Sequence, residues 1–345
     1  MSLRREIFEQ PHVLATLLER ERQHVEQLVA RLRNLDVQYV LVAARGTSLH
    51  AGRYAAHLWG MTIGWPVVLA QPSLFTVYGH PPTLRNALVV GISQSGRSPD
   101  IVRVVEEGRR QGCFTLAVTN DSDAPLAHIA DDVIHLHAGP EKAVAATKTY
   151  TAQLCVIAML TAAWLEEAER WSQLQALPDW VSAALQVEDN AAHLAIRYRF
   201  MERCVMLGRG YDLPTAFEWA LKIKELTYVQ AEPFSTADFQ HGPMALVEPG
   251  FPVFAVVSSG PLFRATKGFL ARLRNQLAAD VTVLSDREEA IEVAHAALRV
   301  PPGVSEWLMP LVSIVPAQLF AYHLTCVRGL DTEAPRYLQK VTETL

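Results

Sequence analysis

The sequence is poor in cysteine, and its four cysteines form no pair or metal-ligand spacing. Cys113, Cys155, Cys204 and Cys326 stand far apart, without a C-x-x-C motif. This pattern argues against a disulfide framework and a zinc site, and it is typical of a reducing compartment. The net charge is only −5, with acidic and basic residues mixed, so the electrostatic signature of a nucleic-acid-binding protein is missing. We therefore expect a cytoplasmic protein without a bound metal or nucleic acid.

Signals for export or membrane insertion are also missing. The opening Met-Ser-Leu-Arg-Arg-Glu contains no apolar stretch of the kind found in signal peptides. The apolar run 154–165 is too short to cross a bilayer, and the longer run 307–324 contains two prolines, a glutamine and a histidine. We expect both runs to be buried helices, the second in the core or at a subunit contact. The remaining composition suits about two globular domains.

Nucleotide-binding motifs are absent, since no Gly-Lys-Ser/Thr occurs and no G-x-G-x-x-G follows a predicted strand. Instead, a buried strand at 86–92 runs into Ser93-Gln94-Ser95-Gly96-Arg97-Ser98-Pro99. Gly96 permits a sharp turn, and Ser98-Pro99 suits the N-cap and first position of a helix at about 100–111. A helix N-terminus surrounded by hydroxyl groups favours an anion, most simply a phosphomonoester. The alternative is a serine-rich surface loop that only caps the helix.

Strands and helices alternate along the first half of the chain. Residues 1–34 are expected to be helical, and strands are predicted at 38–43, 66–70, 86–92, 113–118 and 133–136. A helix at about 49–59 follows the first strand after the turn that holds Thr47-Ser48, a long apolar helix covers about 149–168, and a connector helix covers 178–192 with Pro178 in its first turn. Such alternation predicts a doubly wound parallel sheet with ligands at the carboxyl ends of its strands.

The pattern then starts again, with strands predicted at 204–207, 251–257 and 281–284. Arg45-Gly46 and Arg209-Gly210 lie 164 residues apart, as do Gly96 and Gly260. This constant interval indicates two copies of one α/β unit, of which the second lacks the full set of hydroxyl groups. The expected organisation is a helical segment at 1–34, a first domain at 35–168 that binds the anion, a helical connector at 169–197, a second domain at 198–330 and a tail at 331–345.

The first helix of the second copy, at about 214–229, places Glu218, Lys222 and Glu225 on one face. We expect Asp212 to cap this helix. Spacing alone favours an ordinary exposed ion-pair ladder for the three charges, because such pairs are common on helices.

Two histidine motifs allow further predictions. A loop at 234–245 follows the helix and contains His241-Gly242-Pro243, which predicts a fixed turn that presents an imidazole. His135 and His137 alternate along a predicted strand and would share a face. With no third ligand in view, they are expected to be a packed or solvated pair.

Taken together and in order, these motifs resemble the sugar isomerase (SIS) domain family. More narrowly, they resemble the double-SIS isomerase half of glutamine–fructose-6-phosphate aminotransferase and its stand-alone glucosamine-6-phosphate deaminase relatives. The resemblance covers nearly the whole chain, through residues 6–11, 46–48, 93–96, 144–148, 221–225, 241–243 and 335–342.

The resemblance implies a role for each matching residue. The phosphosugar would be bound by Gly46, Thr47, Ser48, Ser93, Gln94, Ser95, Ser98 and Ala145. Glu225 would move a proton between C1 and C2, and Lys222 would act near the C1 and C2 oxygens or the amino group. His241 would assist ring opening, reaching in from the partner subunit of a homodimer. Lys340 would close over the sugar, and the matching lysine of the synthases can form a Schiff base with the ketose.

The expected function is therefore a deaminase and isomerase that converts glucosamine 6-phosphate to fructose 6-phosphate and ammonia without a cofactor. The chain opens on Arg5-Glu6-Ile7-Phe8 with Ser2 at position 2, so no glutaminase is expected. Departures from the synthase pattern leave other 6-phosphosugar amines open, such as galactosamine 6-phosphate or a fructosyl-amine 6-phosphate; they are Arg45, Ala146, Gln240 and Gln339. A sensor that binds a phosphosugar without turnover is a further alternative.

Overall fold

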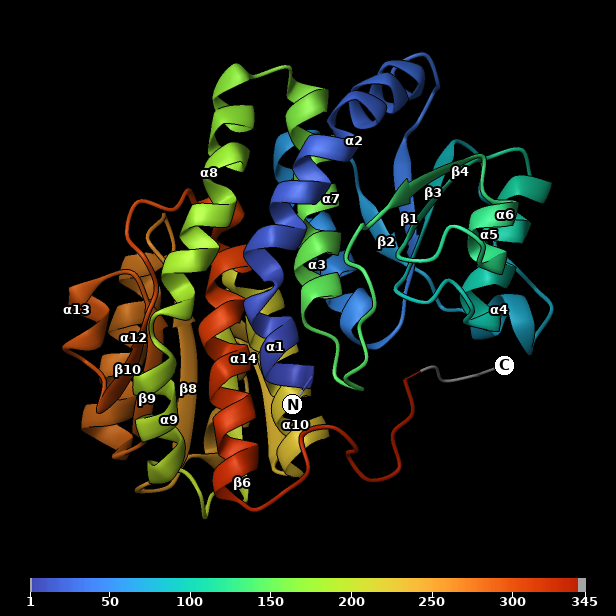
Figure 1. The fold of residues 1–345 in the computed structure, drawn as a ribbon. Helices are drawn as coiled ribbons and strands as arrows, with labels where there is room; N and C mark the ends of the chain where they lie inside the picture. Colours follow the sequence, from blue (N-terminus) through green and yellow to red (C-terminus); the bar gives the residue numbers. More distant parts are fainter. Residues whose placement is uncertain (1, 341–345) are drawn as a thin grey trace. The chain divides into compact units, whose positions relative to one another are not determined.

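A computed structural model describes residues 2–340 and contains two five-stranded, all-parallel sheets, which confirms the predicted α/β fold (Figure 1). The last part of the tail expected at 331–345, with the Val341-Thr342 end of its motif, lies outside the described residues. The first sheet has the order β2-β1-β3-β4-β5, with strands β1 (Tyr39–Ala43), β2 (Val67–Leu69), β3 (Ala87–Ser93), β4 (Phe114–Thr119) and β5 (Asp132–His135).

The second sheet has the order β10-β9-β8-β6-β7. Its strands are β6 (Arg203–Gly208), β7 (Gln230–Ser235), β8 (Pro252–Val257), β9 (Asp280–Ser285) and β10 (Ala296–Arg299). When the sheet is followed from its β7 edge, β6 to β10 take the places of β1 to β5 in the first sheet. The two sheets thus share one topology, as the 164-residue interval predicted.

The chain divides into two compact units, each built on one sheet. The β1–β5 unit contains residues 12–142, 148–176 and the end of the described tail at 339–340. The β6–β10 unit contains residues 2–11, 143–147 and 177–338. Each unit is described below by itself.

In the β1–β5 unit, helices cover both faces of the sheet (Figure 1). One face packs on α4 (Ser73–Thr76), α5 (Pro99–Arg110) and α6 (Pro125–Ile129), through a core that includes Val89, Val104 and Leu126. The other face packs on α3 (Gly46–Thr62), which itself lies beside α7 (Lys148–Leu165). Because both faces are covered, every residue of β3 is buried, which explains its continuous apolar sequence. From residue 12 on, α2 (Gln10–Leu32) also belongs to this unit.

In the β6–β10 unit, one sheet face packs on α11 (Thr236–Phe239), α12 (Phe263–Leu277) and α13 (Glu288–Ile291). The other face carries aromatic contacts, in which Phe254 of β8 meets Tyr198, Trp219 and Phe320. Trp219 lies on α10 (Asp212–Thr227), Phe320 lies on α14 (Met309–Val327), and Tyr198 directly follows α9 (Glu188–Arg197). The remaining elements are α1 (Ser2–Phe8) and the 3₁₀ turns η1 (Pro243–Leu246) and η2 (Glu306–Leu308).

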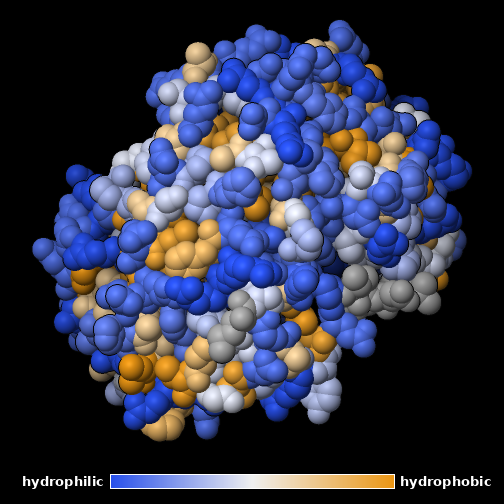
Figure 2. All heavy atoms as spheres, viewed as in Figure 1, coloured by the Kyte–Doolittle hydropathy of each residue, from blue (hydrophilic) through white to orange (hydrophobic). Residues whose placement is uncertain are grey.

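Helix α14 confirms the prediction of a buried apolar helix. Among the described residues, the segment Glu306–Val327 is long and apolar enough to cross a membrane, yet 83% of its most apolar window is buried inside the structure. It packs against α9 and α10, as a core helix does. On the face shown in Figure 2, apolar residues form small groups among hydrophilic ones.

Two predicted elements differ from the structure. Pro178 lies inside α8 (Ala168–Leu185), not in the first turn of a helix at 178–192, and α9 is a separate helix. The helix continues through the proline because Leu174, Leu177 and Val181 are fully buried along it, and this burial outweighs the hydrogen bond that proline cannot donate. The loop predicted at 234–245 begins on β7 and contains α11 and η1, so it is more ordered than expected.

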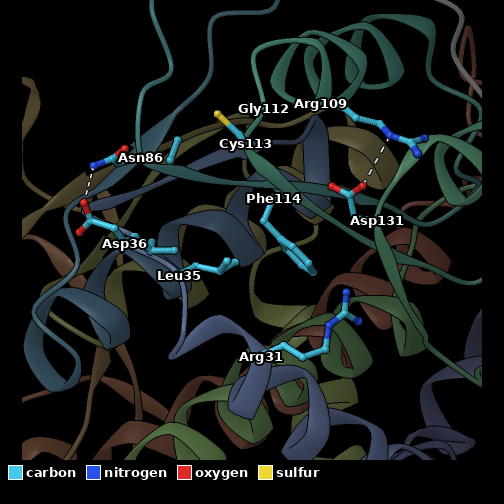
Figure 3. A pocket seen from close by; sticks show the side chains of 11 residues that line it. Arg31, Leu35, Asp36, Asn86, Arg109, Gly112, Cys113, Phe114 and Asp131 are labelled. Carbon is cyan, nitrogen blue, oxygen red and sulfur yellow. Dashed lines mark hydrogen bonds and ion pairs between the residues drawn. The ribbon is translucent and has the colours of Figure 1, made fainter.

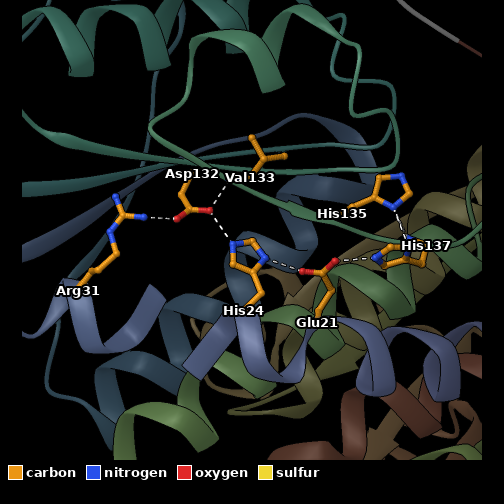
Figure 4. A network of polar contacts seen from close by, with 7 residues as sticks. All are labelled: Glu21, His24, Arg31, Asp132, Val133, His135 and His137. Carbon is orange, nitrogen blue, oxygen red and sulfur yellow. Dashed lines mark hydrogen bonds and ion pairs between the residues drawn. The ribbon is translucent and has the colours of Figure 1, made fainter. Parts of the chain in front are cut away.

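A chain of polar contacts ties α2 to the edge strand β5 (Figure 4). His24 lies between two carboxylates, at 2.7 Å from Glu21 through Nδ1 and 2.7 Å from Asp132 through Nε2. Because carboxylates accept hydrogen bonds, both ring nitrogens carry protons and the ring is an imidazolium. The hydrogen bond that His24 donates to Asp132 contributes most, followed by the one to Glu21, and together they raise the pKa of His24 to about 10. The ion pair between Arg31 and Asp132 extends the chain at one end.

The expected pair of His135 and His137 lies at the other end of this chain, with a different backbone from the one predicted. β5 ends at His135, and His137 has a positive φ of 51°, so the two do not alternate on one strand. Their rings still meet edge to face, and Nε2 of His137 lies 2.6 Å from Glu21. Among residues 2–340, no group of histidine, cysteine and acidic side chains is arranged to hold a metal ion.

Substituting His24 by glutamine is expected to destabilise the protein by about 1–2 kcal/mol near pH 6, a value discounted because about a third of the side chain is exposed. The folded-state pKa is raised, so the stabilisation is complete below the unfolded value of 6.5 and is lost as the pH rises through about 10. Urea unfolding of both proteins from pH 6 to pH 10 measures this difference. A difference that stays constant over this range would contradict the assignment of the charge to His24.

Candidate active site

The hydroxyl-rich loop after β3 is closed by a turn that only glycine allows. Gly96 has a φ of +62°, and a Cβ at this position would lie 2.6 Å from the Cβ of Ala124. The N–H of Gly96 donates a hydrogen bond to Oγ of Ser93 at 3.1 Å, which closes the loop over the end of the strand. The turn therefore presents the side chains of residues 93–98 at the carboxyl end of β3.

Ser98 occupies the N-cap of α5, and Pro99 follows at its first position, as predicted. The Ser98 side chain makes no capping hydrogen bond to the helix. The simpler interpretation, in which the serine loop serves only to cap α5, therefore loses its main support. A helix N-terminus surrounded by hydroxyl groups is a suitable place for an anion.

The turn after β1 lies beside this loop, because β1 and β3 are parallel neighbours with Ala43 paired to Gly91. This turn leads into α3, which begins at Gly46. Thr47 and Ser48 therefore lie at the carboxyl ends of the strands, as the β3 loop does. Ser48 is buried, and Nε2 of Gln153 on α7 donates to its Oγ at 3.0 Å. The hydroxyl of Ser48 thus accepts from Gln153 and keeps its own proton for a ligand.

Arg45 adds a positive charge at the carboxyl ends of these strands, where Arg97 of the β3 loop is paired with Asp121. Its Nε donates to Oδ2 of Asp100 at 2.7 Å, and the Asp100 side chain is completely buried in the first turn of α5. The Arg45 side chain is 53% exposed, so its outer face is open to solvent while Asp100 holds the guanidinium in place. A guanidinium held in this way is well suited to pair with a phosphate oxygen.

In the β6–β10 unit, α10 carries a buried ammonium between two carboxylates. Nζ of Lys222 lies 2.5 Å from Oε2 of Glu225 and 3.4 Å from Oε1 of Glu218. Burial would lower the pKa of Lys222, but the two carboxylates outweigh this effect and raise it. The exposed ion-pair ladder that the spacing also allowed is therefore wrong, since Glu218 and Lys222 are almost completely buried.

Glu225 differs from Glu218 in being reachable from outside. Its side chain is 23% exposed, whereas that of Glu218 is completely buried. One oxygen of Glu225 is held by a permanent ammonium, and the carboxylate still borders solvent. This arrangement can accept a proton from a bound molecule, while Lys222 can stabilise negative charge that develops beside it.

The other predicted site residues fall in both units. His241 and Ala145 belong to the β6–β10 unit, as Lys222 and Glu225 do. His241 is exposed before Gly242, which has a φ of 141°, and Pro243, so the predicted fixed turn is present. Ala145 is buried in the loop 143–147, whose Ala143 N–H donates to Glu6 at 3.2 Å. Lys340 belongs to the β1–β5 unit, where its Nζ donates to Glu141 at 2.7 Å.

The family model of the SIS domain matches residues 36–163 and again 200–328. The chain belongs to the SIS domain family. It is 35% identical to the isomerizing glutamine–fructose-6-phosphate aminotransferase of Thermococcus kodakarensis, over 97% of this chain and 57% of that relative. The chain thus spans little more than half the length of the curated relatives it matches.

Solved SIS structures extend the comparison. A Silicibacter pomeroyi DSS-3 protein, provisionally named a phosphosugar isomerase, has a TM-score of 0.86 and 32% identity over 96% of this chain and 99% of that one. A glucosamine-6-phosphate deaminase from Thermotoga maritima has a TM-score of 0.79 over the full length of both chains. At 21% identity, that second likeness shows a common fold alone.

The second SIS domain fills the equivalent sheet edge with its own carboxylates. Asp212, which corresponds to Ser48 through the 164-residue interval, accepts from the N–H of Ser258 at 3.0 Å and from its hydroxyl. Asp286 accepts from the N–H and the hydroxyl of Ser259 at 2.9 and 2.5 Å. Burial raises the pKa of Asp212 to about 6. These carboxylates take the donors that an external anion would need, so the second domain is unsuited to bind a phosphate here.

This pairing also corrects the prediction that Asp212 caps α10. Tyr211 is the N-cap residue, and Asp212 is the first residue of the helix. The Asp212 carboxylate turns away from the helix N–H groups because Ser258 offers it both a backbone and a hydroxyl donor.

A cavity of about 520 Å³ in the first SIS domain lies at the opposite ends of the strands (Figure 3). It is lined by residues at the amino ends of β3 and β4, including Ala87 and Phe114. Its arginines already face acidic partners, since Arg109 pairs with Asp131 and Arg31 with Asp132. This cavity contains none of the predicted site residues, and the hydroxyl loops remain the stronger candidate.

Three features of the site could not be assigned from the sequence. Asp100, Glu141 and Gln153 act through contacts with Arg45, Lys340 and Ser48, which are distant in sequence. The spacing of Glu218 and Lys222 predicts that they share a helix face, but spacing alone does not distinguish a buried pair from an exposed one.

Proposed function

We propose that the chain is a 6-phosphosugar deaminase and aldose–ketose isomerase that converts glucosamine 6-phosphate to fructose 6-phosphate and ammonia. The observation that carries the proposal is the ion pair on α10 of this SIS-domain chain, in which the partly exposed carboxylate of Glu225 lies beside the buried ammonium of Lys222. The amino-sugar substrate is supported by the aminotransferase relatives, whose name specifies fructose 6-phosphate.

The first SIS domain would bind the phosphate. Thr47, Ser48 and the serines of the β3 loop offer neutral donors, and the N-terminus of α5 adds its N–H groups. Arg45, held by Asp100, would contribute a positive charge here. Gly46, Gln94 and Ala145 complete the proposed set of substrate-binding residues. A grip on the phosphate fixes the reacting carbons, so that its binding energy serves their orientation.

The proton chemistry would belong to α10. Once the sugar ring is open, Glu225 removes the proton from C2 and returns it to C1, so that the aldehyde becomes a hydroxymethyl group and C2 becomes an imine. Water then adds to C2, and ammonia leaves as fructose 6-phosphate forms. Lys222 would stabilise the negative charge on oxygen as the proton leaves carbon. His241, exposed on its turn, would assist ring opening in the partner subunit of a homodimer, and Lys340 would close over the sugar.

Incubation of the purified chain with glucosamine 6-phosphate, without glutamine, is expected to release ammonia and fructose 6-phosphate in equal amounts. The two products are measured by separate coupled assays, because their one-to-one ratio distinguishes deamination from isomerisation of a contaminating sugar phosphate. Galactosamine 6-phosphate serves as the matched epimer, and glucose 6-phosphate, which carries no amino group, as the control.

Absence of both products would contradict the proposal if the protein still binds glucosamine 6-phosphate in calorimetry. Turnover of galactosamine 6-phosphate alone would correct the substrate and keep the reaction class. Binding of the sugar phosphates without turnover of any would replace the enzyme by a phosphosugar sensor.

A further inference from the structure

In the β1–β5 unit, the end of the described tail contacts a loop 199 residues earlier. Nζ of Lys340 donates to Oε2 of Glu141 at 2.7 Å. The Glu141 side chain is completely buried, whereas the Lys340 side chain is 24% exposed. The lysine therefore approaches from the outside and ends on a carboxylate that belongs to the interior of the unit.

Glu141 is itself held in place by the start of α7. Its Oε1 accepts from the N–H of Thr149 at 3.1 Å, and its Oε2 accepts from Oγ1 of the same residue at 2.9 Å. Thr149 lies in the first turn of α7, where a negative charge is favourable. The carboxylate thus has a defined position before the tail arrives, because two of its hydrogen bonds come from a helix end.

Burial of the Glu141 carboxylate also requires compensation. A carboxylate with no solvent exposure is unfavourable unless hydrogen bonds and an opposite charge compensate its lost hydration. Thr149 supplies hydrogen bonds, and Lys340 supplies a full positive charge. The tail residues 335–340 contain no helix or strand. The ion pair with Glu141 can therefore hold the Lys340 side chain in one position.

We propose that Glu141 is a positioning residue that docks the ammonium of Lys340 on the β1–β5 unit and so determines where the tail lysine is presented. The inference rests on the proposed function in one respect, namely that Lys340 acts on the sugar. Nothing in the resemblance to the SIS family assigned a role to Glu141.

The test measures how fast each lysine is acetylated by a small lysine-selective reagent, with rates read by mass spectrometry of the full chain after digestion. Exposed Lys224 serves as the fast reference and buried Lys222 as the slow one. In the unchanged protein, Lys340 is expected to react about tenfold more slowly than Lys224, because reaction requires loss of a charge-assisted hydrogen bond. In Glu141→Gln this protection is expected to disappear, while Lys222 stays unreactive. Glu141→Asp, which keeps the charge, is expected to restore part of it.

Equal Lys340 reactivity in the unchanged protein and in Glu141→Gln would overturn the proposal. Increased reactivity of Lys222 in the variant would show general unfolding. In that case Glu141→Asp is the deciding variant, since only a docking role predicts that restoring the charge also restores the protection of Lys340. Turnover of the sugar phosphate provides a separate readout, in which Glu141→Gln is expected to lower kcat with little change in KM. Full turnover by Lys340→Met would reject the role proposed for Lys340 in the reaction, but the acetylation rates would still test the docking.

Discussion

Replacing Glu225 by glutamine is expected to lower turnover of the sugar phosphate by about 10²–10⁴-fold, the usual contribution of a positioned general base. Glutamine has nearly the same shape and can still accept a hydrogen bond from Lys222, but it cannot take a proton from carbon. Because the phosphate would be held by the first SIS domain, the affinity for substrate should change little. The measurement is kcat and KM in the ammonia assay, together with calorimetric binding of glucosamine 6-phosphate.

Glu202→Gln provides the matched control, since Glu202 is an exposed glutamate of the same unit outside the proposed site. This variant is expected to keep full activity. If Glu225→Gln retained more than about a tenth of the turnover, Glu225 would not be the base, because the expected loss is at least about a hundredfold. Loss of binding together with activity would indicate a different role, in substrate binding.

The second large effect concerns stability. Lys222→Met is expected to destabilise the protein by about 3–5 kcal/mol, because it leaves the carboxylate of Glu218 buried without its counter-charge. Nζ of Lys222 lies within 4 Å of both Glu218 and Glu225, and Glu218 has no solvent exposure with which to recover hydration. Urea unfolding monitored by tryptophan fluorescence measures the loss, and Trp219 on the same helix reports on this region.

The double variant Glu218→Gln/Lys222→Met distinguishes a buried charge from lost packing. Removing both charges is expected to recover a large part of the stability, since the double variant leaves no buried ion at that contact. A double variant as unstable as Lys222→Met alone would show that packing of the lysine side chain, not the uncompensated carboxylate, accounts for the loss.

Much of the fold could be predicted because its signals are local. The apolar strand β3 and the constant 164-residue interval lead to two doubly wound sheets, and the same interval places α12 where α5 lies in the first copy. β7 was missed because Pro233 and three polar residues interrupt its apolar pattern, which an edge strand tolerates. β10 was missed because it is a four-residue edge strand without a β-branched or aromatic residue.

The candidate site was only partly accessible from the sequence. The β3 loop could be predicted, since Gly96 and the serines follow one another and the helix N-cap is a local signal. The supporting contacts could not, because Arg45 meets Asp100 and Ser48 meets Gln153 across 55 and 105 residues. Periodicity reports which face a side chain occupies, whereas such pairs depend on how separate elements pack.

The carboxylates of Asp212 and Asp286 give the duplicated chain an inherent asymmetry. Two copies of one architecture would ordinarily imply two equivalent ligand sites, but the second copy already contains the negative charge that its loop can accommodate. The donors of its two serines are already bound by carboxylates of the same chain. Under the proposed function, the first domain alone would bind the phosphate. In the second domain Asp212 and Asp286 occupy the corresponding donors, and α10 would supply the proton chemistry.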